Sequence, residues 1–316
     1  MISVQSLRVD YEDVTAVCDL NLEVASGEIY GLVGPNGAGK TSTIKAIAGI
    51  LEPTYGEIKI AGFDFDLNPQ EALRHLGFMP DFPPVYEHLK VWEYLDVFAA
   101  GYLIERSSRL SRARHWVERV HLKEKWDAYI RDLSRGMRQR LILAKTLLHD
   151  PDVLLMDEPA SGLDPLARLE MRDILKEIAS EGKTIIISSH ILTELSDFCN
   201  AIGVMEKGRM VVSGSLAELR QRIGAKKELL IRLVNRPAVS DELKQNFFNA
   251  LQISSFISGC KESSPGEFRA FFSGEEKDAA GVLNDLAKKD FPVLEFRIKE
   301  ADVEDIFFKV GAKEVS

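Results

Sequence analysis

A glycine-rich segment near the start of the chain has the composition and spacing of a phosphate-binding loop. Residues 34–41 read GPNGAGKT, which fits G-x-x-x-x-G-K-[ST] at every fixed position. The glycines allow backbone N–H groups to converge on a phosphate chain without interference from Cβ atoms. Lys40 is expected to reach the β- and γ-phosphates, Thr41 to bind Mg²⁺, and Ser42 to contact the α-phosphate. The residues predicted to contact the nucleotide here are Gly34, Pro35, Asn36, Gly37, Ala38, Gly39, Lys40, Thr41 and Ser42.

Two adjacent acids follow a short apolar run later in the chain, at VLLMDE (153–158). A buried strand would hold Asp157 at its carboxyl end, where the carboxylate can bind the hydration shell of Mg²⁺. Glu158 is then placed to polarise an attacking water. Adjacent acids at a strand end are otherwise ordinary surface charge, but a phosphate-binding loop in the same chain favours the functional interpretation. Together the two elements predict a P-loop NTPase.

Alternating strand and helix patterns supply the elements that must position these groups. The phosphate loop lies between a predicted strand and a predicted helix, which is the context that such a loop requires. The alternation predicts a mainly parallel sheet covered by helices. The predicted strands are 2–11, 16–24, 28–34, 56–62, 75–80, 152–159 and 183–190, and the predicted helices are 41–51, 136–149 and 166–182.

Two other segments depart from this alternation. From about 82 to 132 the pattern is helical, with 91–103 and 113–122 as its clearest helices. Beyond Gly224, segments follow in the order β, α, β, β, α, β, which predicts a small ferredoxin-like α+β domain, and a short amphipathic helix over 301–311 comes after it. The predicted domains are therefore a nucleotide-binding domain over 1–222, with a helical subdomain at about 82–132, and an accessory domain over 223–316.

Bulk composition excludes several classes of protein. The 316 residues are 45% hydrophobic and 28% charged, which is ordinary for a globular chain of two domains. A net charge of -9 argues against a nucleic-acid partner, since such a protein would need a basic face. The scattered Cys18, Cys199 and Cys260 fit reduced thiols. Neither a secretion signal nor a long apolar run is visible, so we expect a cytoplasmic protein whose membrane role, if any, comes through a partner.

The subclass of NTPase is indicated by residues 133–165, LSRGMRQRLILAKTLLHDPDVLLMDEPASGLDP. This stretch resembles the region of ABC ATPases that runs from the signature motif to the D-loop. With GLVGPNGAGKT upstream and IIISSH downstream, the resemblance covers residues 1 to about 220. It is closest to bacterial subunits that drive ABC-2-type permeases and permeases like those for sodium or haem export. The fold class expected from the resemblance is an α/β P-loop NTPase of the ABC ATPase type.

The resemblance implies further roles at matching positions. Tyr11 lies where the family has an aromatic that stacks on adenine. Ser134 and Gly136 match signature positions that complete the ATP site of the opposite subunit. Asp164 belongs to the D-loop (161–164), which couples the two sites, and His190 matches the switch histidine that contacts the γ-phosphate.

Three positions depart from the usual family pattern: Asp81, and Arg135 and Met137 in the signature, where glycine and glutamine are commoner. Asp81 falls where the family has a glutamine, and its shorter, anionic side chain keeps an oxygen acceptor for Mg²⁺ or water. Arg135 replaces a commoner glycine in the signature. Its charge could lie near the γ-phosphate or face solvent, and the sequence leaves both open.

The function implied is an ATP-binding and ATP-hydrolysing subunit that uses ATP and Mg²⁺ to power a membrane permease, as an exporter. Two copies would sandwich two ATP molecules as a homodimer, held on the inner face of the cell membrane through the permease, which would contact residues 81–132. A second class, an ABC ATPase that acts on ribosomes or DNA, is disfavoured by the single cassette and the acidic charge. A third reading makes residues 225–316 a ligand-sensing module, although no binding constellation is visible there.

Overall fold

The computed structural model describes residues 1–81, 84–196, 198–222, 227–234 and 241–299. These residues form two compact units that divide between Leu216 and Ala217, at the start of helix α8 (Leu216–Arg222). Within the described ranges, no helix has both the length and the apolar character needed to cross a membrane.

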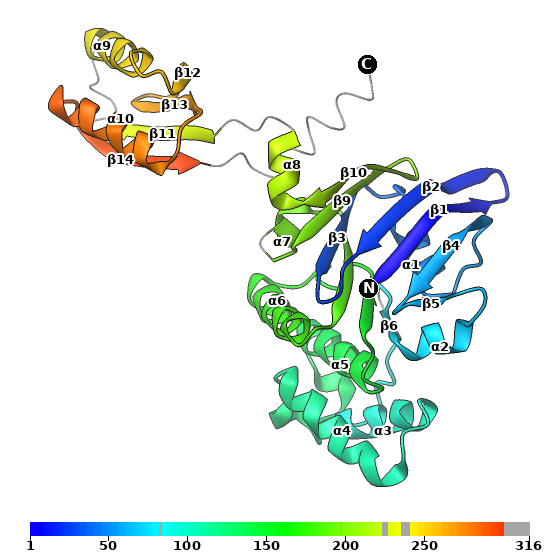
Figure 1. Ribbon diagram of the computed structural model, residues 1–316. Coiled ribbons are helices and arrows are strands. Elements are labelled where there is room, and N and C mark those ends of the chain that lie inside the picture. The colour runs from blue at the N-terminus through cyan, green and yellow to red at the C-terminus, as the bar shows by residue number, and fades with distance from the viewer. Residues whose placement is uncertain (82–83, 197, 223–226, 235–240, 300–316) are drawn as a thin grey trace. The chain divides into compact units, whose positions relative to one another are not determined.

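The larger unit is built on a six-stranded sheet in the order β10-β9-β3-β8-β7-β6 (Figure 1). Pairing is parallel from β9 to β6, while β10 is antiparallel to β9. Strands β3, β7 and β8 are buried along their whole length, as expected for apolar runs in a covered parallel sheet. The bounds are β3 (Ile29–Val33), β6 (Leu76–Met79), β7 (Val153–Met156), β8 (Thr184–Ser189), β9 (Ala201–Glu206) and β10 (Arg209–Ser215).

A second, antiparallel sheet in the same unit has the order β2-β1-β4-β5. Helix α1 lies against it, and one hydrophobic core joins both sheets and the helix through residues such as Leu7, Ile44 and Ile186. Sequence patterns predicted most of these strands but not their separation into a sheet of their own. The bounds are β1 (Ile2–Tyr11), β2 (Val14–Val24), β4 (Tyr55–Ile60), β5 (Phe63–Asp64), α1 (Lys40–Ile47) and α2 (Pro69–Arg74).

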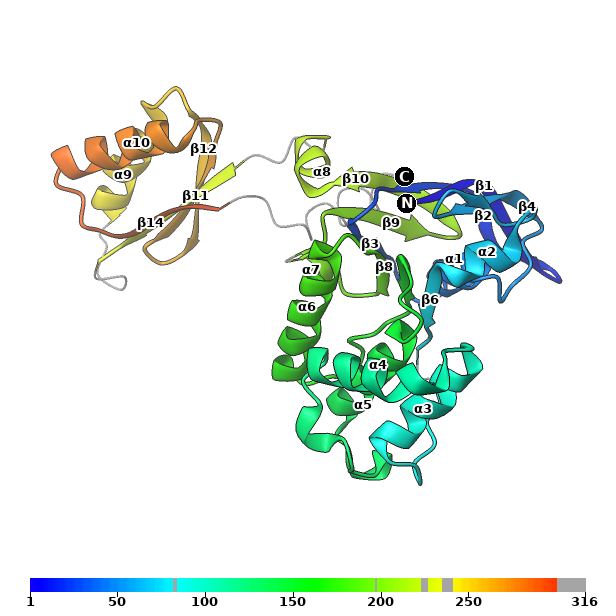
Figure 2. The same cartoon turned by 60° about the horizontal axis from the view of Figure 1, so that its bottom comes forward.

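The helical segment consists of α3 (Val91–Gly101) and α4 (Arg106–Arg119), which pack on α5 (Arg135–Leu147) (Figure 2). Helix α4 begins well before the predicted residue 113. The sequence pattern missed its first two turns because they bury no residue and therefore show no apolar period. Two further helices, α6 (Pro165–Ser180) and the short α7 (Leu192–Ser196), follow β7 and β8.

The smaller unit has a four-stranded antiparallel sheet in the order β12-β13-β11-β14. Its helices share a core with the sheet, in which Phe247 and Leu286 meet Ile231 and Phe268. This is the predicted ferredoxin-like arrangement. The bounds are β11 (Lys227–Leu233), α9 (Asp241–Gln252), β12 (Ile257–Ser264), β13 (Glu267–Phe272), α10 (Glu276–Lys288) and β14 (Val293–Lys299).

In the smaller unit, the structure differs from the predicted start of one strand, and two predicted segments lie outside the described residues. The segment 253–260 predicts the second strand of this unit, but β12 begins only at Ile257, because Ile253 is exposed and lies in a turn. The predicted helix over 301–311 lies outside the described residues, as do residues 223–226 of the predicted boundary.

Candidate nucleotide-binding site

The phosphate loop lies between the end of β3 and the start of α1. Gly39 caps the helix with φ +101° and Gly37 has φ +81°, which is backbone that favours glycine. At Gly34 a Cβ atom would lie 2.3 Å from the carbonyl oxygen of Met205 in β9. The Gly208 N–H, in the turn after β9, donates to the Ala38 oxygen at 3.0 Å. The phosphate loop therefore packs on the β9–β10 hairpin. The first N–H groups of α1 lie on the side of the loop that faces the cleft.

Lys40 is almost fully buried within this loop. Its Nζ donates to the carbonyl oxygens of Gly34 (2.8 Å) and Pro35 (3.3 Å) and lies 3.7 Å from Glu158 Oε1. Burial lowers the pKa of Lys40, while the carboxylates of Glu158 and Asp157 oppose that shift. A cation held among backbone carbonyls can exchange them for phosphate oxygens without moving far.

Asp157 follows β7 and is only 2% exposed. Its Oδ1 accepts hydrogen bonds from Ser188 Oγ at 2.6 Å and from Thr41 Oγ1 at 3.2 Å. Its backbone N–H donates to the Met79 oxygen in β6. Three strands and the phosphate-loop helix thus fix this carboxylate beside the Thr41 hydroxyl, as a joint ligand for a cation would require.

Glu158 adopts φ +48°, an uncommon conformation for a residue other than glycine. Its backbone N–H donates to Ser188 Oγ at 2.9 Å, so one serine holds both acids at this strand end. His190 Nδ1 donates to Glu158 Oε2 at 2.9 Å. The two residues that sequence analysis placed at the hydrolytic step therefore touch. Ser188 was missed, although it stands two positions before His190 at the end of a buried strand.

These groups open into one cleft of about 620 Å³. Of the predicted residues, Asn36 to Ser42, Asp81, Glu158 and His190 line it. Five further residues were not singled out as contacts: Val14, Thr15, Ala16, Ser161 and Lys207. They come from the start of β2, the D-loop and the β9–β10 turn, none of which carries a phosphate-binding pattern in its own sequence.

Known proteins show which family uses such a cleft. Residues 17–161 match the family model described as ABC transporter. Nod factor export ATP-binding protein I of Cupriavidus metallidurans is 36% identical over 219 residues, which cover 69% of this chain and 72% of that protein. The protein of the same name from Burkholderia lata is 31% identical over 315 residues, or 99% of this chain and 98% of that one.

This chain belongs to the ABC transporter ATP-binding family. A solved structure described as the ATP-binding subunit of an ABC transporter agrees, with 30% identity, a TM-score of 0.64, and coverage of 71% of this chain and 93% of its own. The predicted family and fold class are confirmed. The chain is thus an ATP-binding subunit with ATPase activity, and the likeness to the Burkholderia protein extends through the smaller unit.

Four residues that the family resemblance assigns to nucleotide do not line this ABC subunit's cleft, namely Tyr11, Ser134, Gly136 and Asp164. Ser134 caps α5, where its side chain accepts from the Met137 N–H at 3.3 Å. Asp164 caps α6 by accepting from the Ala167 N–H at 2.9 Å. A Cβ on Gly136 would lie 2.7 Å from Ala167 Cβ, so the starts of α5 and α6 are in contact.

The structure also shows the surroundings of Tyr11 and Arg135, two positions that the family resemblance singled out. Tyr11 ends β1 and is 44% exposed, with its hydroxyl 3.4 Å from Ser42 Oγ at the rim of the phosphate loop. Arg135 packs its guanidinium against Gly162 of the D-loop, where a Cβ would lie 2.5 Å from Cζ. The sequence left two environments open for Arg135, the γ-phosphate and solvent. The guanidinium instead packs against the D-loop of its own chain.

The cleft's oxygen groups fit a cation that is shared with a nucleotide. Among the described residues, no three His, Cys, Asp or Glu side chains gather so as to hold a metal ion by themselves. The Thr41 hydroxyl and the carboxylates of Asp157 and Asp81 are hard oxygen donors of the kind that Mg²⁺ takes alongside phosphates.

Proposed function

We propose that this ATPase is the energy-coupling subunit of an exporter, acting from the inner face of the cell membrane on a separate permease. The observation that carries the proposal is the series of contacts from Lys40 through Glu158 to His190, in the cleft that the phosphate loop lines. Export is supported by the printed names of two relatives, both Nod factor export ATP-binding proteins.

In the proposed chemistry, the chain's own residues bind the phosphates and activate water. Lys40 and the N–H groups of residues 36–41 would hold the β- and γ-phosphates. Thr41 and Asp157, with Asp81 nearby, would hold Mg²⁺, which supplies positive charge to the phosphate oxygens when bound. Glu158 would accept the proton of the attacking water, and His190 would hold Glu158 in place and face the γ-phosphate.

A second copy of the chain is part of the proposal. Ser134 and Gly136 lie at the start of α5, outside the cleft that their own phosphate loop forms. The start of a thirteen-residue helix presents N–H groups and a positive dipole end, which suit the γ-phosphate of a neighbouring molecule. Two copies placed head to tail would therefore complete two ATP sites.

An aromatic surface on the helical segment is the proposed contact with the permease. The rings of Tyr86, Tyr94 and Phe98 form a cluster, with Tyr86 59% and neighbouring Val97 51% exposed. Lys145 Nζ lies 5.2 Å from the Phe98 ring centroid, and burial lowers the pKa of Lys145. The exposed Tyr86 and Val97, backed by the buried Tyr94 and lying beside a poorly solvated cation, fit an amphipathic helix that carries an acidic residue.

Co-purification tests the assignment. The tagged Glu158→Gln chain, isolated from detergent-solubilised membranes with Mg-ATP, should retain one integral-membrane protein in a fixed ratio. Tyr86→Glu combined with Val97→Glu should release that protein, while Leu67→Glu, which alters an exposed apolar residue outside both the helical segment and the nucleotide cleft, should not. Recovery of ribosomes or DNA in place of a membrane protein would contradict the proposal.

A further inference from the structure

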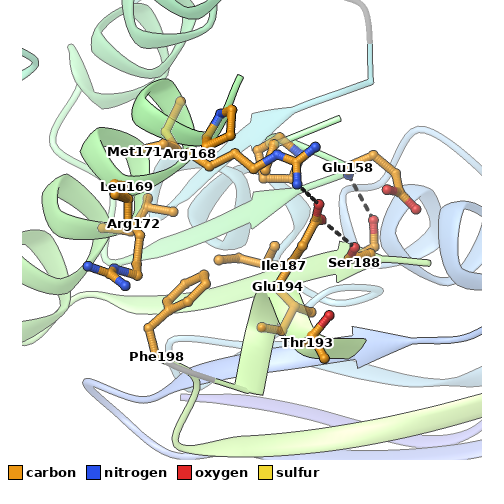
Figure 3. A pocket seen from close by; sticks show the side chains of 16 residues that line it. Glu158, Arg168, Leu169, Met171, Arg172, Ile187, Ser188, Thr193, Glu194 and Phe198 are labelled. Atoms are coloured by element: carbon orange, nitrogen blue, oxygen red, sulfur yellow. Dashed lines mark hydrogen bonds and ion pairs between the residues drawn. The ribbon is translucent and has the colours of Figure 1, made fainter. Parts of the chain in front are cut away.

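A cavity separates helix α6 from the segment that follows β8. Its volume is about 280 Å³, and its walls are largely apolar (Figure 3). Leu169 and Leu175 face it from α6, and Ile187, Leu195 and Phe198 face it from the other side. An unfilled space of this size removes van der Waals contacts between the elements on either side of it. Apolar packing therefore joins these two elements only weakly here.

Two charged side chains bridge the same gap. Arg168, on α6, places Nη1 2.7 Å from Oε1 of Glu194, on α7 (Figure 3). Arg168 Nε also donates to the carbonyl oxygen of Leu163 in the D-loop, at 3.1 Å. Since the Glu194 side chain is only 15% exposed, water screens this pair less than a surface ion pair.

The far side of Glu194 reaches the residue before the switch histidine. Ser189 Oγ donates to Glu194 Oε2 at 3.2 Å and accepts from the Ile191 N–H at 3.0 Å. His190 lies between these two residues, and its Nδ1 donates to Glu158 Oε2. A continuous series of contacts thus runs from the D-loop through Arg168 and Glu194 to the backbone around His190, and from His190 to Glu158.

We propose that Arg168 and Glu194 are positioning residues for ATP hydrolysis. They hold the backbone around His190 at a fixed distance from the D-loop, so that the imidazole stays within hydrogen-bond reach of Glu158. Neither side chain needs to touch nucleotide for this effect. The inference rests on the roles proposed above for His190 and Glu158, and it adds the D-loop as the place from which His190 is held.

Matched arginine variants test the bridge. Arg168→Met breaks the ion pair and the contact with Leu163, and we expect kcat to fall by roughly 10- to 100-fold, since displacing a reacting group by about 1 Å can have that cost. Arg172→Met makes the same change one turn later, at an arginine that lines the same cavity but pairs with the adjacent Asp173, and should leave kcat unchanged. The Kd for Mg-ATP, measured by calorimetry, should be the same in both variants.

A double-mutant cycle separates positioning from general damage. Glu194→Gln keeps the side-chain shape, and alone it should lower the single-turnover rate as Arg168→Met does. In a His190→Ala background it should add nothing, because the group it positions is already absent. A structural defect would lower the rate again. If Glu194→Gln shows a collapsed melting transition, Glu194→Asp serves instead, since it keeps the charge but shortens the bridge.

Three results would overturn the proposal. Wild-type kcat in Arg168→Met and Glu194→Gln, together with a deep loss in His190→Ala, would remove the bridge and leave the proposed function standing. Additive losses in the cycle would mean that Glu194 acts through something other than His190. Wild-type turnover in His190→Ala would remove the role proposed for His190, and the positioning role with it.

Discussion

The two parts of the proposed ATP site differ in how far one chain completes them. In the phosphate-loop cleft, Lys40 and Asp157 are buried, and each contacts a group from a distant part of the sequence, Lys40 through Glu158 and Asp157 through Thr41 and Ser188. At the starts of α5 and α6, Ser134 and Asp164 are exposed, and each side chain accepts a hydrogen bond from an N–H group of its own helix. The first part is organised within one chain, whereas the second is an exposed surface that a second copy would cover in the proposed dimer.

The largest effect is expected in the cleft, which the comparison treats as the catalytic part of the site. Glu158→Gln should reduce turnover by about 10²–10⁴-fold, because the amide cannot accept a proton from water. ATP binding should persist, since Lys40 and the loop are unchanged. Phosphate release under saturating Mg-ATP measures the loss, with Glu181→Gln, at an exposed acid paired with Arg119, as control. Turnover near the wild-type value would take Glu158 out of the base role.

A substitution at the exposed start of α5 should affect dimer formation rather than ATP binding. Glu158→Gln protein should form dimers only with ATP, since ATP bound between two copies stabilises the closed pair by mass action. Adding Ser134→Arg should abolish the dimer and spare ATP binding, because the larger side chain blocks the approach of the second copy. Light scattering with and without ATP reports both states, and Ser111→Arg, on the exposed face of α4, is the control. A dimer that forms without ATP, or that tolerates Ser134→Arg, would point to another interface.

Ser188 measures how firmly the first part is organised. Ser188→Ala leaves the buried Asp157 carboxylate and the Glu158 N–H short of one partner each. We expect the free energy of unfolding to fall by about 1–3 kcal/mol, and kcat to fall less than in Glu158→Gln. Urea unfolding gives the first value and phosphate release the second. Ser180→Ala, at a serine exposed near the end of α6, should change neither, and equal behaviour of the two variants would show that Ser188 is not a support.

Asp81 tests a smaller feature of the cleft. If it occupies the family's glutamine position, Asp81→Gln should preserve or raise ATPase activity, because the longer neutral side chain restores the usual oxygen acceptor. Steady-state rates over a range of Mg²⁺ concentrations are the measurement. A loss as deep as that of Lys40→Ala would give the carboxylate a dedicated role.

The smallest effect is expected from removing the accessory unit. Deleting residues 225–316 should leave a folded protein with unchanged affinity for ATP, since every residue lining the cleft lies at or before Lys207 and the smaller unit has its own core. Calorimetry on the truncated and full chains compares the two affinities. A truncated chain that folds but no longer binds ATP would mean that residues after 224 complete the site.

Sequence patterns predicted what depends on residue type and missed what depends on where backbones meet. The phosphate loop, Asp157, Glu158 and His190 stand next to recognisable strands, so their convergence could be foreseen. The contributions of Thr15 and Lys207 could not, because these residues reach the cleft through pairing of distant strands rather than through a local pattern.

The same limit applies to the elements themselves. Helix α4 buries Ala113, Trp116 and Val117 in its second half alone, so only that half shows an apolar period. Arg135 could not be placed from sequence because its neighbour, Gly162, comes from a loop that the signature motif does not specify.

The dependence of the phosphate loop on β9 has a consequence for synthesis of the chain. Gly34 and Ala38 contact backbone at Met205 and Gly208, and β3 pairs with β8 and β9. At ribosomal speeds, residue 208 is added on the order of ten seconds after residue 41. During that interval the nascent chain carries the nucleotide motif but lacks the backing that shapes it. We therefore expect ATP to bind only after the β9–β10 hairpin has left the ribosome, too late to guide the early folding of this cassette.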